Sequence, residues 1–177
     1  SSASAPTAPS ASSLHPLQSR THTTTTTSFE TPLTSSSFLS QKYDTVIIDL
    51  GAGVDNTVRR LVHTANKVIV IITDEPTSLT DGYALIKLTH SENSKANIQV
   101  VTNIVSSTKS GERTYGTLLK ACQGFLKITP PLLGIIRQDP KVPDSIRAQA
   151  TLLTRHPNSN AAQDIETIAK VISTAHN

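Results

Sequence analysis

The sequence predicts an α/β fold, with a mostly parallel sheet and helices on both of its faces. Short runs rich in Val and Ile alternate with longer segments of helical period, and each run is apolar on both faces, as strands buried in a parallel sheet are. Strand–helix–strand alternation indicates right-handed connections between neighbouring parallel strands. We expect this fold to occupy residues 41–177 as one domain.

The predicted strands are the four short apolar runs. In chain order they are Tyr43–Asp49, Lys67–Thr73, Asn97–Asn103 and Pro131–Ile136. Four strands make a thin sheet for a doubly wound domain, which suggests that part of the domain is missing.

The predicted helices lie between and after these runs. They are Val54–Asn66, Ser78–Ser91, Glu112–Lys127 and Ala161–Ala175. In the last segment, Ile165, Ile168 and Ile172 recur at helical spacing, and Asn158 and Ser159 precede it as suitable caps.

Residues 1–40 have a different composition from the rest of the chain. Ser and Thr account for 21 of them, and Thr23–Thr27 is an unbroken run of threonines. Such a segment has too little apolar surface to offset the entropy of ordering it, so we expect a disordered tail. With Arg20 as its one basic residue, the tail is unlike an arginine-rich transit peptide.

Composition also excludes several classes of protein. The single cysteine, Cys122, rules out an intrachain disulfide and a multi-cysteine zinc site. The longest purely apolar run, Val68–Ile72, is far shorter than the roughly 20 residues that cross a bilayer. The net charge is only +3 and the basic residues are scattered, so we expect no binding to nucleic acid. We expect a cytoplasmic protein.

Polar residues follow the predicted strands at the edge where open α/β sheets bind their ligands. Asp49 can hold Mg²⁺ through water, and the N–H groups of Gly51 and Gly53 can approach a phosphate. The same three residues also suit a helix cap and a tight turn. Asn103 can offer a donor and an acceptor to a purine edge, or it can hold a turn through its own backbone.

The common phosphate-binding motifs are not found in these 177 residues. Gly111 and Gly116 have the glycine spacing of a P-loop, but Thr117 and Leu118 stand where Lys and a hydroxyl residue are required. The dinucleotide-binding fingerprint fails at Asn56, where a third glycine is needed.

Taken together, five ordered segments resemble the MinD/ParA-type deviant P-loop ATPases. They resemble the flagellar-number regulators FlhG/FleN of that family more closely than MinD itself. The resemblance covers about residues 42–173. The segments are Tyr43–Gly53, Val70–Lys87, Val100–Asn103, Leu133–Val142 and His156–Ala162.

This resemblance implies an ATPase that uses ATP and Mg²⁺, forms an ATP-dependent homodimer and regulates flagellar number or the position of a cellular structure. It also implies peripheral association with the inner membrane and, by analogy, a flagellar GTPase of the SRP type as a partner. The implied roles are Mg²⁺ binding and catalysis for Asp49, the γ-phosphate for Gly51, Ala52 and Gly53, and adenine for Asn103 with the loop at Ile136 and Arg137.

The sequence also departs from the family. The phosphate loop and its lysines are expected upstream of Tyr43, where this chain has its Ser/Thr-rich tail, and Arg137 replaces a proline. Because phosphoryl transfer depends on positioning and charge neutralisation, we expect an incomplete nucleotide-binding domain with little or no ATP hydrolysis alone. The alternative is a non-catalytic protein-interaction module that keeps the fold and binds no nucleotide. A flavodoxin-like receiver domain is the weakest reading.

Overall fold

The computed structural model describes residues 43, 45–51 and 56–174. The chain divides into two units after Asp49. Every helix and strand of the described residues lies in the second unit, Leu50–Asn177. The predicted Ser/Thr-rich tail lies outside the described residues. No helix in the described part of the chain is long and apolar enough to cross a membrane.

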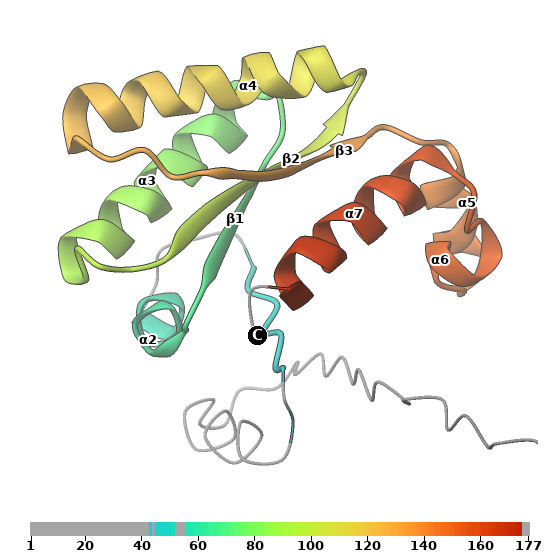
Figure 1. The fold of residues 1–177 in the computed structure, drawn as a ribbon, viewed down its shortest axis with the longest axis horizontal. Coiled ribbons are helices and arrows are strands. Elements are labelled where there is room, and N and C mark those ends of the chain that lie inside the picture. Colours follow the sequence, from blue (N-terminus) through green and yellow to red (C-terminus); the bar gives the residue numbers. More distant parts are fainter. Residues whose placement is uncertain (1–42, 44, 52–55, 175–177) are drawn as a thin grey trace, which may run out of the picture. The chain divides into compact units, whose positions relative to one another are not determined.

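Three of the predicted strands form a parallel sheet in the order β1-β2-β3 (Figure 1). They are β1 (Val68–Ile72), β2 (Ile98–Val105) and β3 (Leu132–Arg137). β2 is the middle strand and pairs in parallel with both neighbours. The predicted α/β fold with a parallel sheet is confirmed, with β1 at one edge.

The predicted strand over Tyr43–Asp49 is wrong. The described residues of this stretch have no strand conformation, and the side chain of Ile47 is 54% exposed. A run of β-branched residues has a high strand propensity, but propensity alone supplies no partner for the backbone N–H and C=O groups. The described residues of Tyr43–Asp49 are therefore irregular, since a strand also needs a neighbouring strand to pair with.

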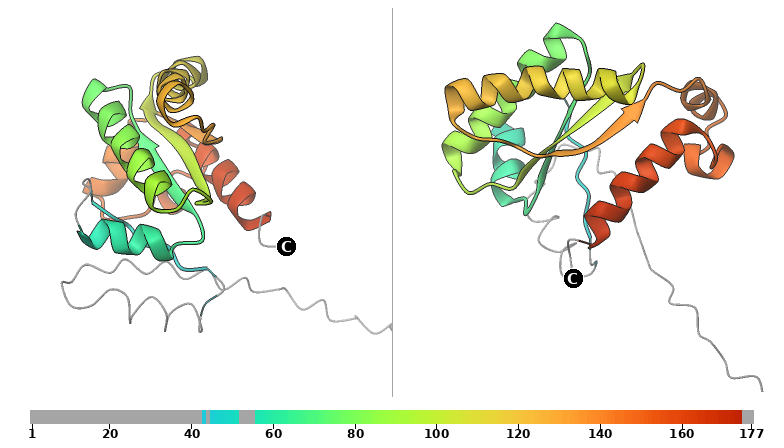
Figure 2. Two further views of the ribbon diagram at one scale, coloured as in Figure 1. Left: turned by 90° about the vertical axis from the view of Figure 1, so that its left-hand side faces the viewer. Right: turned by 45° about the horizontal axis from the view of Figure 1, so that its top comes forward.

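Helices cover both faces of the sheet (Figure 2). Gly134 of β3 faces Ile168 of α7 (Asn160–Thr174), whereas the next residue, Ile135, faces Gly111 of α4 (Thr108–Ala121). Since successive residues of a strand point to opposite faces, α7 and α4 lie on opposite sides. α3 (Pro76–Glu92) packs on β1 and α4, and α2 (Asn56–Thr64) packs on α3.

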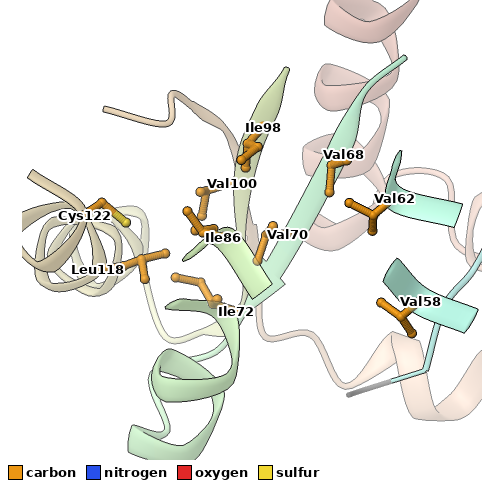
Figure 3. Close-up of a cluster of buried hydrophobic side chains, with 10 residues drawn as sticks. All are labelled: Val58, Val62, Val68, Val70, Ile72, Ile86, Ile98, Val100, Leu118 and Cys122. Carbon is orange, nitrogen blue, oxygen red and sulfur yellow. The ribbon is translucent and has the colours of Figure 1, made fainter. Parts of the chain in front are cut away.

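The main hydrophobic core lies between the sheet and α2, α3 and α4 (Figure 3). Its strand residues alternate along β1, where the side chains of Val68, Val70 and Ile72 are buried and those between them are exposed. The other members come from the helices and β2: Val58, Val62, Ile86, Ile98, Val100, Leu118 and Cys122.

Local signals set the helix starts. α3 begins with Pro76, whose fixed φ suits the first turn. α4 begins at Thr108, before the predicted Glu112, because the Ser107 hydroxyl accepts the Ser110 N–H and caps the first turn. α4 ends in a single π-helical turn, η1 (Cys122–Leu126).

The stretch between β3 and α7 holds two short helices that the sequence pattern did not predict. They are α5 (Lys141–Arg147) and α6 (Leu152–Arg155). The predicted cap of the last helix is confirmed at Ser159, whose hydroxyl accepts the Ala162 N–H at 3.3 Å.

Candidate nucleotide site

The carboxyl ends of β2 and β3 lie side by side and bring together three of the predicted site residues. Thr102 pairs with Ile135 and Val105 pairs with Arg137. Asn103 on β2 is therefore next to Ile136 and Arg137 on β3. Neighbouring parallel strands place their carboxyl ends at one edge, so this juxtaposition follows from the sheet topology.

A β-bulge interrupts β2 at Asn103. Between its pairs with Ile135 and Arg137, β2 has two residues, Asn103 and Ile104, opposite the single Ile136. Ile104 adopts φ 57°, in the left-handed region, which is unusual for a β-branched residue. Its backbone N–H donates to the Asn103 side-chain oxygen, Oδ1, at 2.9 Å.

Of the two roles that the sequence left open for the Asn103 amide, the structure shows the one in which it holds a turn, and the contact with a purine stays a prediction. The amide oxygen holds the turn by accepting the Ile104 N–H. A carboxamide oxygen accepts two hydrogen bonds and its nitrogen donates two. None of the bonds found among the described residues uses the nitrogen, so the amide keeps a donor and an acceptor for a ligand.

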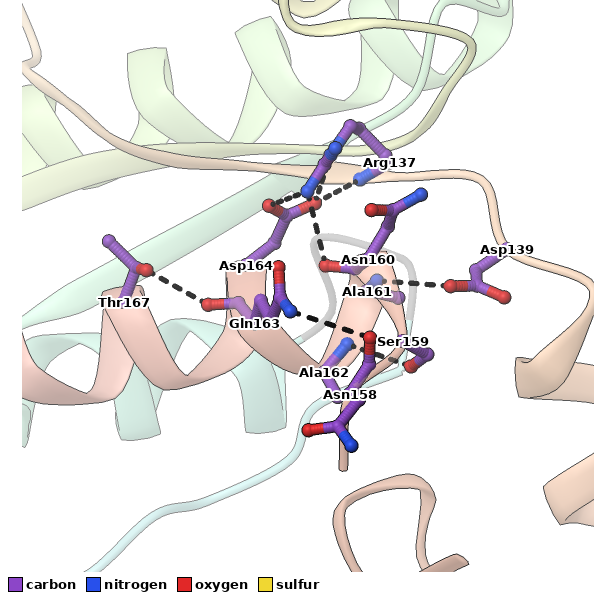
Figure 4. A network of polar contacts seen from close by, with 10 residues as sticks. All are labelled: Arg137, Asp139, Asn158, Ser159, Asn160, Ala161, Ala162, Gln163, Asp164 and Thr167. Atoms are coloured by element: carbon purple, nitrogen blue, oxygen red, sulfur yellow. Dashed lines mark hydrogen bonds and ion pairs between the residues drawn. The ribbon is translucent and has the colours of Figure 1, made fainter. Parts of the chain in front are cut away.

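The Arg137 side chain is held against α7 (Figure 4). Its Nε and Nη2 atoms donate to the two carboxylate oxygens of Asp164 at 2.9 and 2.8 Å, and its backbone N–H donates to the same carboxylate at 3.0 Å. This bidentate pair fixes the end of β3 to the helix. Arg137 can serve a base-binding loop through its backbone, while its side chain anchors that loop.

Two carboxylates support this loop, and sequence reasoning assigned neither of them. Burial raises the pKa of Asp164, but the hydrogen bonds and charge of Arg137 outweigh it and leave that pKa below its ordinary value. The pKa of Asp139 is lowered chiefly by the Lys141 N–H, and also by the Ala161 N–H. Asp139 lies just after β3, in the segment Arg137–Pro140. Its carboxylate also accepts the Ala161 N–H in the first turn of α7, and no pattern in the sequence indicates this contact.

The predicted phosphate and Mg²⁺ residues are Asp49, Gly51, Ala52 and Gly53. Asp49 lies in the first unit and its side chain is exposed. Gly51 is exposed, and a Cβ there would meet nothing within 4 Å. Ala52 and Gly53 lie outside the described residues. The role of these four residues stays a prediction.

Comparison with known proteins finds similar sequences among flagellar proteins. It is 29% identical over 134 residues to the antiactivator FleN of Pseudomonas aeruginosa, across 76% of this chain and 48% of FleN. It is 28% identical over 130 residues to the flagellum site-determining protein YlxH of Helicobacter pylori, across 73% of this chain and 44% of YlxH. No family model matches.

Solved structures of similar fold include the MinD cell division protein of Aquifex aeolicus. That match has a TM-score of 0.60 and 23% identity, and it covers 80% of this chain and 58% of that one. The septum site-determining protein MinD of Pyrococcus horikoshii, solved with Mg-ADP, has a TM-score of 0.61 and 20% identity over 77% of this chain and 53% of its own.

These likenesses show that the chain has the α/β fold of the MinD structures. In sequence it is similar to the flagellar proteins FleN and YlxH. It spans about half the length of the curated relatives it matches.

Proposed function

We propose that this chain is the base-binding part of a MinD/ParA-type ATPase that regulates flagellar number or the position of a cellular structure. Its relatives support the biological role, since YlxH is a flagellum site-determining protein. The observation that carries nucleotide binding is the Asn103 amide, which lies at the carboxyl end of the middle strand beside the loop anchored by Arg137.

The described residues fit a purine base. The Asn103 carboxamide combines donors with a remaining acceptor position, and a purine edge presents the complementary pair. Ile136, half-buried on β3, offers an apolar side chain to one side of a planar ring. The ion pair between Arg137 and Asp164 holds this loop in place. The charge of Arg137 is thereby neutralised by Asp164 rather than by a ligand.

The phosphate end of the ligand is assigned by the family resemblance. Asp49 would organise Mg²⁺ and the attacking water, and the backbone of Gly51, Ala52 and Gly53 would lie at the γ-phosphate. Bound Mg²⁺ would neutralise phosphate charge. We expect this chain alone to bind nucleotide and to hydrolyse little or none of it.

The finer points of the resemblance belong to the same proposal. They are an ATP-dependent homodimer, a flagellar GTPase of the SRP type as partner, a cytoplasmic location and peripheral contact with the inner membrane. One structural neighbour is a complex of MinC with MinD from Aquifex aeolicus, which supports a protein partner of some kind.

Isothermal calorimetry with ATP, ADP and Mg²⁺ tests nucleotide binding. Asn103→Asp keeps an oxygen for the Ile104 N–H but removes the N–H donors, so we expect ATP affinity to fall at least about tenfold. Asn93→Asp is the matched control. Its side-chain oxygen also accepts a backbone N–H, from Lys95 at 3.0 Å, but it precedes β2 and so lies at the opposite end of that strand.

Two results would contradict this reasoning. The wild type showing no heat with ATP or ADP at millimolar concentration would end the nucleotide proposal. Equal loss of affinity in Asn103→Asp and Asn93→Asp would show a general effect of added charge. The variant Asp49→Ala tests the Mg²⁺ assignment, because affinity that is indifferent to this change excludes Asp49 as the metal residue.

A non-catalytic protein-interaction module is the second candidate, and the edge strand favours it. Ile71 of β1 is 60% exposed on the face opposite the core, and Ile69 beside it is 37% exposed. Strands of parallel sheets are normally buried on both faces. Absence of ATP binding, together with binding of an apolar dye that Ile71→Thr lowers, would support this candidate.

A further inference from the structure

We propose that Ile104 is a positioning residue, whose left-handed conformation fixes the Asn103 amide at the rim of the candidate nucleotide site. This inference rests on the proposed function. Ile104 itself is not expected to contact the nucleotide. Three observations at the end of β2 carry it.

The first observation is that the bulge is costly for the residue that makes it. Ile104 has φ 57°, where the Cβ of a β-branched residue is crowded against its own backbone. Its side chain is also 55% exposed, so burial of apolar surface offsets little of this strain. Residues held in such conformations cluster at functional sites.

The second observation is that the bulge sets two residues of β2 against one residue of β3. Asn103 and Ile104 lie opposite the single Ile136. Their side chains are less buried than those of Thr102 and Val105 on either side, which are fully buried. A bulge leaves its extra residue out of the ladder and changes the direction of side chains beside it, so Asn103 and Ile104 depart from the regular pattern near the carboxyl end of β2.

The third observation is the hydrogen bond that the bulge creates. In a regular ladder the Ile104 N–H would point along the sheet to a neighbouring strand or to solvent. Here it donates to Asn103 Oδ1 at 2.9 Å. This bond restrains rotation of the Asn103 amide and so orders the donor and acceptor before a ligand arrives, which lowers the cost of binding.

The variant Ile104→Gly tests the proposal. Glycine enters the left-handed region without strain but also samples other regions, so the fold is kept while the lock on Asn103 is lost. Lys127→Gly is the matched control. Lys127 also has a positive φ, 60°. It precedes β3, so it lies toward the amino-terminal ends of the strands, away from Asn103.

Two measurements on the 177-residue chain distinguish the possible outcomes. In the first, nuclear magnetic resonance follows the side-chain amide protons of Asn103, assigned from their loss in Asn103→Asp. We expect relaxation typical of a restrained side-chain amide in the wild type and in Lys127→Gly, and relaxation typical of a freely rotating amide in Ile104→Gly. Identical relaxation of the Asn103 signals in all three proteins would overturn the proposal.

The second measurement is calorimetry with ATP and GTP. Both glycine variants are expected to melt at or above the wild-type temperature, because glycine relieves the strain of a positive φ. Only Ile104→Gly should bind ATP about tenfold more weakly than the wild type. It should also lose the preference for ATP over GTP. Wild-type affinity and preference in Ile104→Gly would overturn the inference. If the wild type binds neither nucleotide, the proposed function fails, and the amide signals alone decide whether Ile104 positions Asn103.

Discussion

Substitution of Gly134 by alanine should detach α7 from the sheet in part, and its cost can be worked out from the structure. An alanine Cβ at this position would overlap the Cγ1 atom of Ile168 and lie 2.7 Å from its Cδ1. Non-bonded carbon atoms prefer separations of about 3.5–4.0 Å. Because α7 faces the backbone of β3 here, we expect Gly134→Ala to lower the free energy of unfolding by about 2 kcal/mol.

A double-mutant cycle shows whether this steric account is correct. Ile168→Ala removes the two clashing atoms and leaves its Cβ 3.8 Å from the new methyl group, an ordinary contact. The half-buried Ile168 should itself cost about 2 kcal/mol when truncated. If the two changes were independent, the double variant would lose about 4 kcal/mol; we expect a loss of only about 2 kcal/mol, since the new methyl group fills the vacated space.

Urea unfolding followed by far-ultraviolet circular dichroism is the suitable assay, because the chain has no tryptophan. A loss of about 2 kcal/mol corresponds to a fall of about 8 °C in melting temperature for a domain of this size. The reasoning would be refuted if the two substitutions were additive, or if Gly134→Ala left stability unchanged. Either result would mean that α7 does not approach β3 as closely as the structure shows.

Two further predictions concern titratable groups. Hydrogen bonds from His156 and Arg155 lower the pKa of Asp144 from 3.8 to about 2, so its stabilising contribution is complete above about pH 4 and is lost as the pH falls toward about 2. The melting temperature of Asp144→Asn should therefore be below that of the wild type at neutral pH and converge with it near about pH 2; a constant difference would contradict the pairing. Burial raises the pKa of the Cys122 thiol, and its side chain is inaccessible, so a thiol reagent at neutral pH should label it only after unfolding in urea. Rapid labelling of the folded chain would show that η1 opens.

Regular features of the fold could be predicted from the sequence because they rest on local patterns. The strand Val68–Ile72 is apolar and β-branched throughout, and α7 shows apolar residues at helical spacing with a serine cap. The irregular Tyr43–Asp49 shows the limit, since its composition is that of a strand but the ladder it needs depends on other segments. The bulge at Ile104 has no local signal either, because neither glycine nor asparagine occupies the left-handed position.

The candidate site shows the same division between local and tertiary information. The position of Asn103 near the carboxyl end of β2 could be predicted because the largely apolar run Ile98–Val101 lies just before it, and the carboxyl ends of parallel strands lie together. The roles of Asp139 and Asp164 could not, because both depend on where α7 docks. Asp164 lies 27 positions from Arg137 in the chain, and no periodicity relates the two.

Arg137 stands where the resemblance leads us to expect a proline, and the docking of α7 gives this arginine a structural role. Proline would fix φ through its ring and would have no backbone N–H. Arg137 has an N–H, which donates to Asp164, and its guanidinium bonds the same carboxylate with both Nε and Nη2. A proline ring would restrain the loop locally, whereas here the contact between Arg137 and Asp164 of α7 restrains it. It follows that the geometry of this loop depends on α7. If the proposed base binding holds, Gly134→Ala should weaken it by displacing α7, even though Gly134 lies outside the candidate site.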